Sequence, residues 1–176
     1  MSDLPMNLFL HCPRCGARRA ETGTNPLRCT HCHWTYYFNP TCAVGVFLFD
    51  ESDRVLWIRR AKEPRQGTLA IPGGFIDHGE PAEIALSREV REEIGIELGP
   101  VRFLGSHPNL YHYAGVTYPV VDFLFTGRVG TTSDVQPLDG VAAIEWKGLN
   151  DISDDDIAFP SIRRGRELLQ ATSIGT

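Results

Sequence analysis

The spacing of apolar positions separates a short polar beginning from a longer segment of alternating strands and helices. From residue 41 onward, apolar runs of strand length are separated by turn-forming residues, and two stretches have helical periodicity. Strands are predicted at 41–49, 54–60, 101–105, 118–126 and 141–146. Residues 69–79 begin with apolar residues, which predict a further strand, and end in a glycine-containing loop. Helices are predicted at 81–94 and 160–170. This order of elements predicts an α/β domain.

The first predicted helix has clear end signals and one buried face. Pro81 suits a first helical position, and Gly95 suits the position after the last turn. Leu86, Val90 and Ile94 recur every four residues and form one stripe. We expect this stripe to face the core.

Composition and charge limit the classes of function. The chain has 176 residues, 42% of them hydrophobic and 22% charged, and its formal net charge is −5. Such a charge gives no general attraction for nucleic acid, so we do not expect nucleic acid as a partner. No apolar run has the length of a membrane helix, and residues 1–10 lack the features of an export signal. The predicted location is the cytoplasm.

Four of the five cysteines form two C-x2-C pairs near the start of the chain. The pairs are Cys12 with Cys15 and Cys29 with Cys32, and thirteen residues separate them. Two such turns supply four tetrahedral thiolate ligands, which predicts a closed, structural Zn²⁺ site. We therefore predict a zinc ribbon at 1–37 followed by a catalytic domain at 38–176. The ribbon's few arginines leave open either nucleic-acid binding or a role in solubility alone.

Three glutamates cluster at the edge of the predicted buried stripe. At about 100° per residue, Glu89, Glu92 and Glu93 fall within an arc of roughly 100°. Like charges this close destabilise a helix, unless divalent cations such as Mg²⁺ bind between them and a phosphate-containing substrate. The alternative is a solvated, salt-bridged surface helix. The preceding Gly73 and Gly74 favour the metal site, because they permit close backbone approach.

These residues match the Nudix box, G-x5-E-x7-R-E-U-x-E-E-x-G-U with U aliphatic, at every fixed position. The matching residues are Gly74, Glu80, Arg88, Glu89, Val90, Glu92, Glu93, Gly95 and Ile96. The chain therefore resembles Nudix hydrolases, and the looser resemblance extends from about residue 38 to residue 170. It implies a Nudix α/β/α sandwich with a mixed sheet.

The resemblance also implies roles for residues of the box. Glu89, Glu92 and Glu93 look like the ligands of catalytic Mg²⁺ or Mn²⁺, with a backbone carbonyl of Gly73 or Gly74 as a further contact. Glu89 is also the candidate for activating water. Arg88 resembles the residue that orients these carboxylates, and Glu80 is expected to organise the loop. Arg88, Glu89, Glu92 and Glu93 are therefore predicted to be catalytic residues, and Glu80 a residue that organises the motif.

A zinc ribbon before a Nudix domain is similar to the layout of NADH pyrophosphatases. That subfamily carries S-Q-P-W-P-F-P after the box, but here only Ser106 and Pro108 agree with it. The chain is more similar to Nudix enzymes of the ADP-ribose or nucleotide-sugar type. Asp139 and Glu145 are substitutes for a further acidic metal ligand that the family often has near a late tryptophan.

Four residues outside the box are candidate substrate contacts. Arg59 and Arg60 end a predicted strand and offer bidentate contacts to phosphate, while Tyr111 and Tyr113 offer rings for stacking on a base. Solvated strand ends and ordinary packing are the alternatives.

The predicted function is metal-dependent hydrolysis of a diphosphate bond. The substrate would be a nucleoside diphosphate linked to another moiety, such as ADP-ribose, NADH or a similar dinucleotide. The alternative is a Nudix module that senses nucleotides, or binds nucleic acid or protein, without turnover. A third interpretation, removal of nucleotide caps from RNA, uses the same chemistry. The predicted partner is a small nucleotide without any membrane contact, and the family allows a homodimer.

Overall fold

The computed structural model describes residues 3–130 and 134–173, which divide into two compact units. The first unit comprises Met1–Thr41 and Leu110–Val120, and the second comprises Cys42–Asn109 and Val121–Thr176. The sequence pattern did not connect the segment Leu110–Val120 with the N-terminal residues. The domain boundary after residue 37 stays a prediction.

The first unit is small and has little apolar core. It contains helix α1 (Pro5–Leu8) and the antiparallel strands β1 (Leu27–Arg28) and β2 (Thr35–Tyr36). Its buried residues are Cys12, Leu27, Cys29 and Val120, and the first three form one small cluster. A core of this size rarely stabilises a fold without a metal or a disulfide.

Hydrogen bonds link the N-terminal part of this unit to the end of a β-hairpin. The backbone N–H of Thr117 donates to the carbonyl oxygen of Asp3 at 3.1 Å. The hydroxyl of Thr117 donates to the Asp3 carboxylate at 2.6 Å. These contacts explain why Leu110–Val120 belongs to the first unit.

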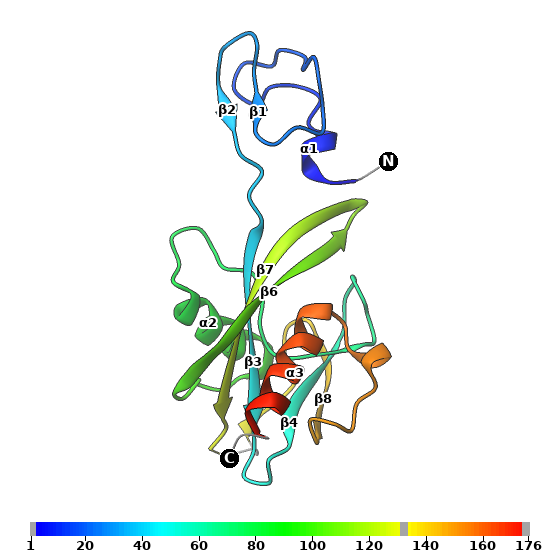
Figure 1. Ribbon diagram of the computed structural model, residues 1–176. Coiled ribbons are helices and arrows are strands. Elements are labelled where there is room, and N and C mark those ends of the chain that lie inside the picture. The colour runs from blue at the N-terminus through cyan, green and yellow to red at the C-terminus, as the bar shows by residue number, and fades with distance from the viewer. Residues whose placement is uncertain (1–2, 131–133, 174–176) are drawn as a thin grey trace. The chain divides into compact units, whose positions relative to one another are not determined.

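The second unit is built on a six-stranded sheet (Figure 1). Along the sheet the strands follow the order β5-β4-β3-β7-β6, and β8 pairs with β4. The strands are β3 (Thr41–Phe49), β4 (Val55–Arg60), β5 (Leu69–Ala70), β6 (Val101–Tyr113), β7 (Val116–Arg128) and β8 (Val141–Lys147). The pairs β3–β4, β4–β5 and β4–β8 are antiparallel, and an isolated bridge from Leu69 to Ile157 is parallel.

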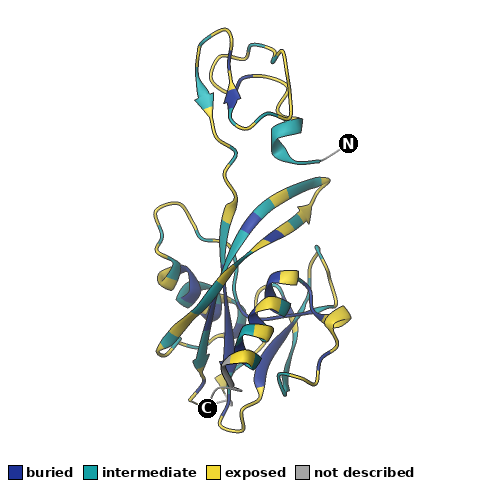
Figure 2. Cartoon of the chain, viewed as in Figure 1, coloured by how far each residue is buried: buried dark blue, intermediate teal, exposed yellow. Residues whose placement is uncertain are grey.

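Both faces of this sheet are covered. Residues 44–48 of β3 are all buried, and so are the first four residues of β4 (Figure 2). Uninterrupted burial means that helices lie on both sides, since side chains alternate between the faces of a strand. The covering helices are α2 (Ala82–Ile94) and α3 (Pro160–Ser173). The predicted α/β fold with a mixed sheet is confirmed.

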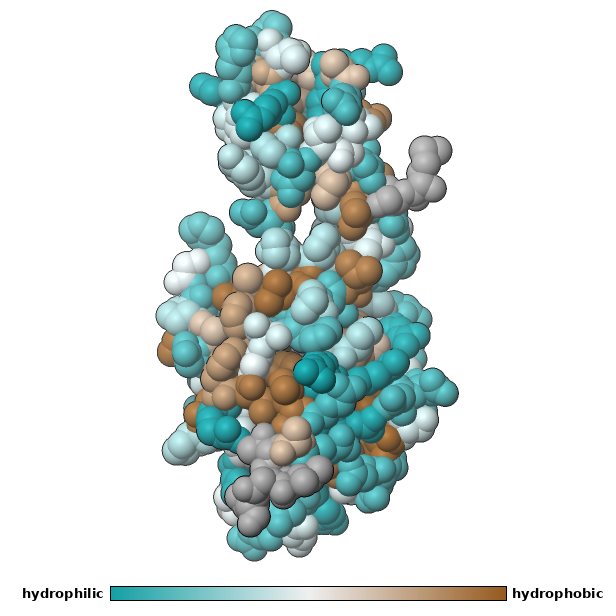
Figure 3. Space-filling model, in the orientation of Figure 1, coloured by the Kyte–Doolittle hydropathy of each residue, from teal (hydrophilic) through white to brown (hydrophobic). Residues whose placement is uncertain are grey.

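Close packing against α3 depends on a glycine. A side chain at Gly165 would place its Cβ 2.6 Å from the Phe47 ring and 2.8 Å from Leu124. The solvent side of this helix is polar, and the face in Figure 3 is largely hydrophilic over α3. Among the described residues, no helix is long and apolar enough to cross a membrane.

The predicted strand at 101–105 is too short. Strand β6 continues to Tyr113 and forms a long hairpin with β7. The residues after Gly105 are mostly exposed or half-buried, with Asn109 an exception. Polar residues and Pro108 therefore interrupt the apolar alternation that predicts a strand. The 3₁₀ helix η2 (Asp154–Asp156) was not predicted, and α3 begins at the predicted residue but continues to Ser173.

Candidate functional site

The loop between β5 and α2 approaches β3 so closely that Gly73 must be glycine. The φ angle of Gly73 is +149°, and a Cβ there would lie 2.1 Å from the carbonyl oxygen of Val44, so only glycine fits. A Cβ on Gly74 would lie 2.5 Å from the Glu89 carboxyl group and would displace this side chain. The loop therefore lies directly against the carboxylate helix.

Backbone hydrogen bonds fix this loop on the sheet. The amide of Val44 donates to the carbonyl oxygen of Gly74 at 2.9 Å, and the amide of Val46 donates to that of Pro72 at 3.0 Å. A carbonyl oxygen has two lone pairs, so that of Gly74 retains one for a cation. The predicted metal contact of Gly74 stays a prediction.

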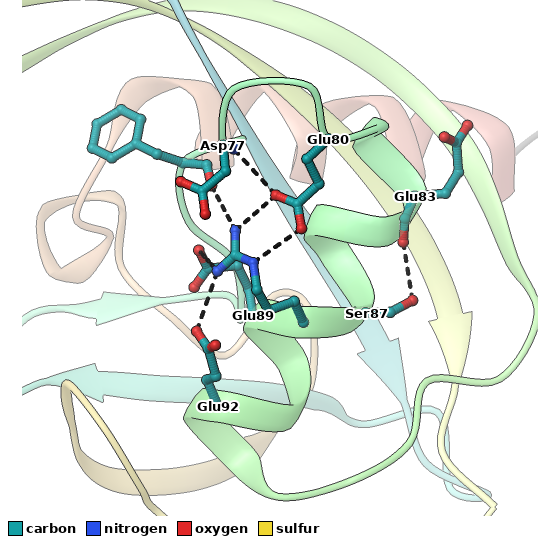
Figure 4. Close-up of polar contacts among 8 residues, drawn as sticks. Asp77, Glu80, Glu83, Ser87, Glu89 and Glu92 are labelled. Atoms are coloured by element: carbon teal, nitrogen blue, oxygen red, sulfur yellow. Dashed lines mark hydrogen bonds and ion pairs between the residues drawn. The ribbon is translucent and has the colours of Figure 1, made fainter.

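Arg88 binds three carboxylates at once. These carboxylates belong to Glu80, Glu89 and Glu92, which lie around one centre in Figure 4. The Arg88 guanidinium donates to Glu80 through Nε and Nη2, each at 3.0 Å, and to Glu89 through Nη1 at 2.8 Å. The same Nη1 reaches Glu92 at 3.2 Å, and Nη2 donates to the carbonyl oxygen of Phe75 at 3.0 Å. One cation therefore holds three carboxylates and the loop in a fixed arrangement.

Glu80 precedes α2 and closes the loop before it. Its carboxylate accepts a hydrogen bond from the backbone N–H of Asp77 at 3.1 Å as well as those from Arg88. Hydrogen bonds from the Arg88 side chain, and then from the Asp77 amide, hold the pKa of Glu80 below its usual range. Glu80 is therefore charged at neutral pH and positioned to organise the loop.

Glu93 lies deeper than the other box glutamates. Its carboxylate accepts a hydrogen bond from the amide of Gly73 at 2.9 Å. Burial raises the pKa of Glu93 to about 8, and the nearby Glu89 carboxylate acts in the same direction. Burial also raises the pKa of Glu89, although Arg88 opposes that shift. A bound cation would stabilise the charged forms of both side chains.

Of the two strand-end arginines, Arg60 is the one whose charge acts on this cluster. Its positive charge lowers the pKa of Glu93, whereas the charge of Asp139 raises it. The guanidinium of Arg60 also donates to the carbonyl oxygen of Pro64 at 2.8 Å and lies 5.1 Å from the Phe159 ring centroid.

Arg59 is engaged elsewhere. It forms an ion pair with Glu145 and donates to the carbonyl oxygen of Gly67 at 2.6 Å. Lys147 holds the other oxygen of Glu145 at 2.7 Å. The substitute acidic ligand Glu145 is therefore neutralised by two cations on β4 and β8, and Asp139 pairs with Lys62 at 2.8 Å. A role for Arg59 in binding substrate stays a prediction.

Tyr111 and Tyr113 lie in the first unit, near the end of β6. Their ring centroids are 6.4 Å apart, and the ring planes are tilted by 39°. The carboxylate cluster lies in the second unit. Contact of these tyrosines with a substrate stays a prediction.

The four cysteines of the C-x2-C pairs lie together. Their Sγ atoms are all within 4.8 Å of one another. The closest pairs are Cys12–Cys32 at 3.8 Å and Cys15–Cys29 at 3.7 Å. The backbone N–H groups of Cys32 and His31 lower the pKa of Cys29 to about 6, which favours a thiolate. This donor set and its compactness fit a tetrahedral zinc site.

The box glutamates supply a different set of donors. Their carboxylate oxygens, with a nearby backbone carbonyl, fit hard divalent cations such as Mg²⁺ and Mn²⁺. Among the described residues, only the four cysteines form a compact group of three or more possible ligand atoms. Arg88 holds Glu89 and Glu92, while the Gly73 amide holds Glu93. The glutamates thus differ from the cysteines, whose sulfur atoms lie next to one another instead of being held by other parts of the protein.

Fold and site together define an α/β domain in which a carboxylate helix faces a glycine-rich loop. The NUDIX domain family model matches residues 39–166. The chain therefore belongs to the NUDIX domain family. A NUDIX hydrolase from Nitrosomonas europaea, known from its crystal structure, is 26% identical, with a TM-score of 0.63, and the alignment covers 90% of this chain and 87% of that one.

Two relatives with assigned activities match shorter segments. The NAD-capped RNA hydrolase NudC of Mycobacterium bovis (strain BCG / Pasteur 1173P2) is 39% identical over 66 residues, which are 38% of this chain and 21% of the relative. The ADP-ribose pyrophosphatase of Methanocaldococcus jannaschii is 38% identical over 60 residues, which are 34% of this chain and 35% of the relative. The matches span about a fifth to a third of these relatives.

Proposed function

We propose that this chain is a metal-dependent pyrophosphohydrolase that cleaves the diphosphate bond of a nucleoside diphosphate linked to another moiety. The observation that carries this proposal is the arrangement around Arg88, which fixes Glu89 and Glu92 near the loop of Gly73 and Gly74, where position 73 admits only glycine. A diphosphate is anionic, so it needs cations between itself and this acidic cluster. The names of the two relatives mention ADP-ribose and NAD-capped RNA, which favours a substrate of the ADP-ribose or dinucleotide type. NADH remains a candidate of this class.

The chain's residues would divide the chemical work. Glu89, Glu92 and Glu93, with the Gly74 carbonyl, would hold Mg²⁺ or Mn²⁺, which supplies charge neutralisation at the diphosphate when bound. Glu89 is the candidate to accept a proton from the attacking water. The water oxygen bonds to one phosphorus, the bond from that phosphorus to the bridging oxygen breaks, and two phosphate products result.

Arg88 and Glu80 would act through the carboxylates instead of touching the substrate. The hydrogen bonds of Arg88 restrict the side chains of Glu89 and Glu92, and Glu80 anchors both Arg88 and the Asp77 amide. Fixed ligands lower the reorganisation that each catalytic cycle requires. We assign both as positioning residues.

The zinc assignment is a separate part of the proposal. Cys12, Cys15, Cys29 and Cys32 would bind one structural Zn²⁺ and stabilise the first unit, whose own core is small. A cytoplasmic location and a homodimer stay predictions from the sequence.

Metal-dependent hydrolysis of a nucleotide panel tests the catalytic assignment. ADP-ribose, NADH, NAD⁺, FAD, diadenosine polyphosphates and nucleoside triphosphates are incubated with zinc-loaded protein and Mg²⁺ or Mn²⁺, and phosphate release is coupled to a phosphatase. We expect cleavage of at least one diphosphate-linked nucleotide. Glu92→Gln and Glu93→Gln should each lose at least about a hundredfold in kcat, since they remove a proposed cation ligand.

The matched control is Glu83→Gln. Glu83 is an exposed glutamate in the first turn of the same helix, and its side chain has no assigned role. The control makes the same chemical change on the same helix and should keep wild-type activity. If Glu92→Gln and Glu93→Gln remain as active as Glu83→Gln, their proposed roles are wrong. If folded wild-type protein cleaves no member of the panel, the module without turnover is favoured instead.

A further inference from the structure

The two units differ in charge and in the exposure of apolar side chains. The chain has 17 basic and 22 acidic residues, but the first unit holds four arginines and only two carboxylates. Its net charge is therefore +2, and that of the second unit is −7. Among the residues whose burial is described, twelve large apolar side chains are exposed, and eight of them lie in the first unit, namely Leu8, Phe9, Leu10, Tyr36, Tyr37, Leu110, Tyr113 and Tyr118.

Three of the four arginines line one cavity. Arg18, Arg19 and Arg28 contribute to a hollow of about 340 Å³, which Thr24 and Thr30 also line. Glu21 is the one carboxylate in this lining, so three guanidinium groups face a single negative charge. Within residues 3–130 and 134–173, no carboxylate lies within 4.0 Å of the guanidinium of Arg18 or Arg28. Guanidinium groups and hydroxyls around a hollow of this size suit a phosphate group.

Beside its small core the same unit has an aromatic stack, formed by Phe9, Tyr36 and Trp34. The rings of Tyr36 and Trp34 are nearly parallel, with centroids 5.4 Å apart. Those of Phe9 and Tyr36 are nearly parallel at 6.4 Å. Phe38 packs edge-on against both Phe9 and Tyr36. Phe9 and Tyr36 remain 38% and 40% exposed, so the stack continues to the surface.

Arg19 connects the cavity with the aromatic stack. Its Nη1 donates to the carbonyl oxygen of Phe9 at 2.8 Å and to that of Met6 at 3.1 Å, and its Nη2 donates to the Thr24 hydroxyl at 3.2 Å. Arg19 therefore lines the cavity and also binds the backbone of Phe9, an outer ring of the stack.

We propose that the first unit binds single-stranded nucleic acid, with phosphates at the arginine-lined cavity and bases on the aromatic stack. Aromatic rings stack on unpaired bases of any sequence, and guanidinium groups neutralise the backbone. In a double helix the base faces are stacked on one another, so its phosphates could bind at the cavity but its bases could not stack on the aromatic rings. A second copy pairing through this unit would bring two positively charged surfaces together. The proposal concerns a surface outside the carboxylate cluster and does not depend on hydrolysis.

Fluorescence anisotropy with a labelled single-stranded oligoribonucleotide tests the proposal. The full zinc-loaded chain is titrated against a 5′-hydroxyl oligonucleotide, which carries no diphosphate bond and so reports on binding alone. We expect binding that weakens with salt and is stronger for the single strand than for a duplex of the same length. Arg18→Gln/Arg28→Gln should weaken binding and reduce the slope of log K against log salt by about 1.4, because each lost phosphate contact removes about 0.7.

Tyr36→Leu removes the middle ring, which stacks on both Phe9 and Trp34. Loss of this support for the outer rings should weaken binding by at least about fivefold, the loss expected when one base is no longer stacked. The matched control is Tyr37→Leu, because Tyr37 is the next residue and is 58% exposed. The control for the arginines is Arg102→Gln/Arg164→Gln, two exposed positions in the second unit. Zinc content and far-UV circular dichroism confirm that each variant is folded.

Three outcomes would overturn the proposal. One is the absence of any binding by wild-type protein at low salt. The second is an equal loss of binding in the control variants. That result would show that binding depends on the general charge or apolar surface of the protein and not on the proposed site. The third is self-association that Tyr36→Leu abolishes without any binding of the oligonucleotide, which would show that the exposed rings contact a second copy.

Discussion

The four cysteines and the three box glutamates are both predicted metal sites, but the protein holds them differently. The cysteine sulfurs lie within 4.8 Å of one another. Arg88 holds two of the glutamates, and a backbone amide holds the third. Carboxylates that are ionised together repel one another, and the positive charge of Arg88 offsets this repulsion for Glu89 and Glu92.

This difference matches the work that each site is proposed to do. A closed set of four sulfur ligands leaves no position for a substrate, so its metal contributes to folding. The glutamates form no such closed group among the described residues, which leaves room for water and phosphate oxygens around a hard cation. Arg88 and the glycine loop supply the order that such an open site would otherwise lack.

The largest expected effect is loss of the cysteine site. Cys29→Ser removes one of four proposed zinc ligands, and such a site contributes about 10 kcal/mol or more to folding. We expect the variant to lose zinc and its first unit to lose protection from hydrogen exchange. Metal analysis and exchange mass spectrometry measure these changes. Cys42→Ser is the control, since Cys42 lies outside the cluster. Equal zinc content in both variants would contradict the assignment.

The next largest effect concerns the centre of the carboxylate cluster. Arg88→Ala leaves Glu80, Glu89 and Glu92 without their shared cation. Hydrogen bonds to charged groups each contribute about 1.5–3 kcal/mol, so we expect the free energy of unfolding to fall by about 2 kcal/mol or more. Urea denaturation measures it. Arg91→Ala, an exposed position on the same helix, should change it by less than about 0.5 kcal/mol. A similar loss of unfolding free energy in both variants would contradict the central role of Arg88.

The pH dependence of stability separates Glu93 from the other glutamates. Burial raises the pKa of Glu93 to about 8, so between its ordinary pKa and pH 8 the folded state retains a proton that the unfolded state has released. The stability from this group is therefore full at low pH and falls as the pH rises toward 8.

Denaturation without added Mg²⁺ or Mn²⁺ should show this decline in wild-type protein. In Glu93→Gln the decline should be reduced, because glutamine does not titrate. Adding Mg²⁺ should restore stability near pH 8, since a cation favours the charged carboxylate. Identical pH profiles for the two proteins would show that Glu93 does not titrate in this range.

The smallest expected effect concerns the two acidic residues considered as further metal ligands. Arg59 and Lys147 neutralise Glu145, and Lys62 pairs with the exposed Asp139. Glu145→Gln and Asp139→Asn should each leave kcat and the Mg²⁺ concentration for half-maximal activity within about threefold of wild type. A tenfold or larger rise in that Mg²⁺ concentration for either variant would identify it as a ligand.

Local signals in the sequence were sufficient for the carboxylate helix and for several strands. The predicted strand at 41–49 matches β3, and the predicted helix at 81–94 differs from α2 by one residue at its start. Gly95 ends this helix in the left-handed conformation, as its position indicated. These features depend on periodicity and end residues, which are local properties of the chain.

Such local signals did not predict the end of the β6–β7 hairpin. No element was predicted for residues 106–113, yet they form a strand whose far end belongs to the first unit. Contacts of Thr117 with Asp3, more than a hundred positions earlier, account for part of this grouping. Long-range pairing of this kind leaves no pattern in a window of neighbouring residues.

The sequence by itself determined the two ligand sets and the order of elements, because ligand spacing and helix periodicity are written in residues close along the chain. Only the tertiary structure decided that Arg60, and not Arg59, acts on Glu93, since neighbouring residues of a strand point to opposite faces. The tertiary structure also gathered three arginines of the first unit around one cavity, although the net charge of the whole chain is negative. Net charge sums over the chain, whereas binding depends on which side chains the fold brings together.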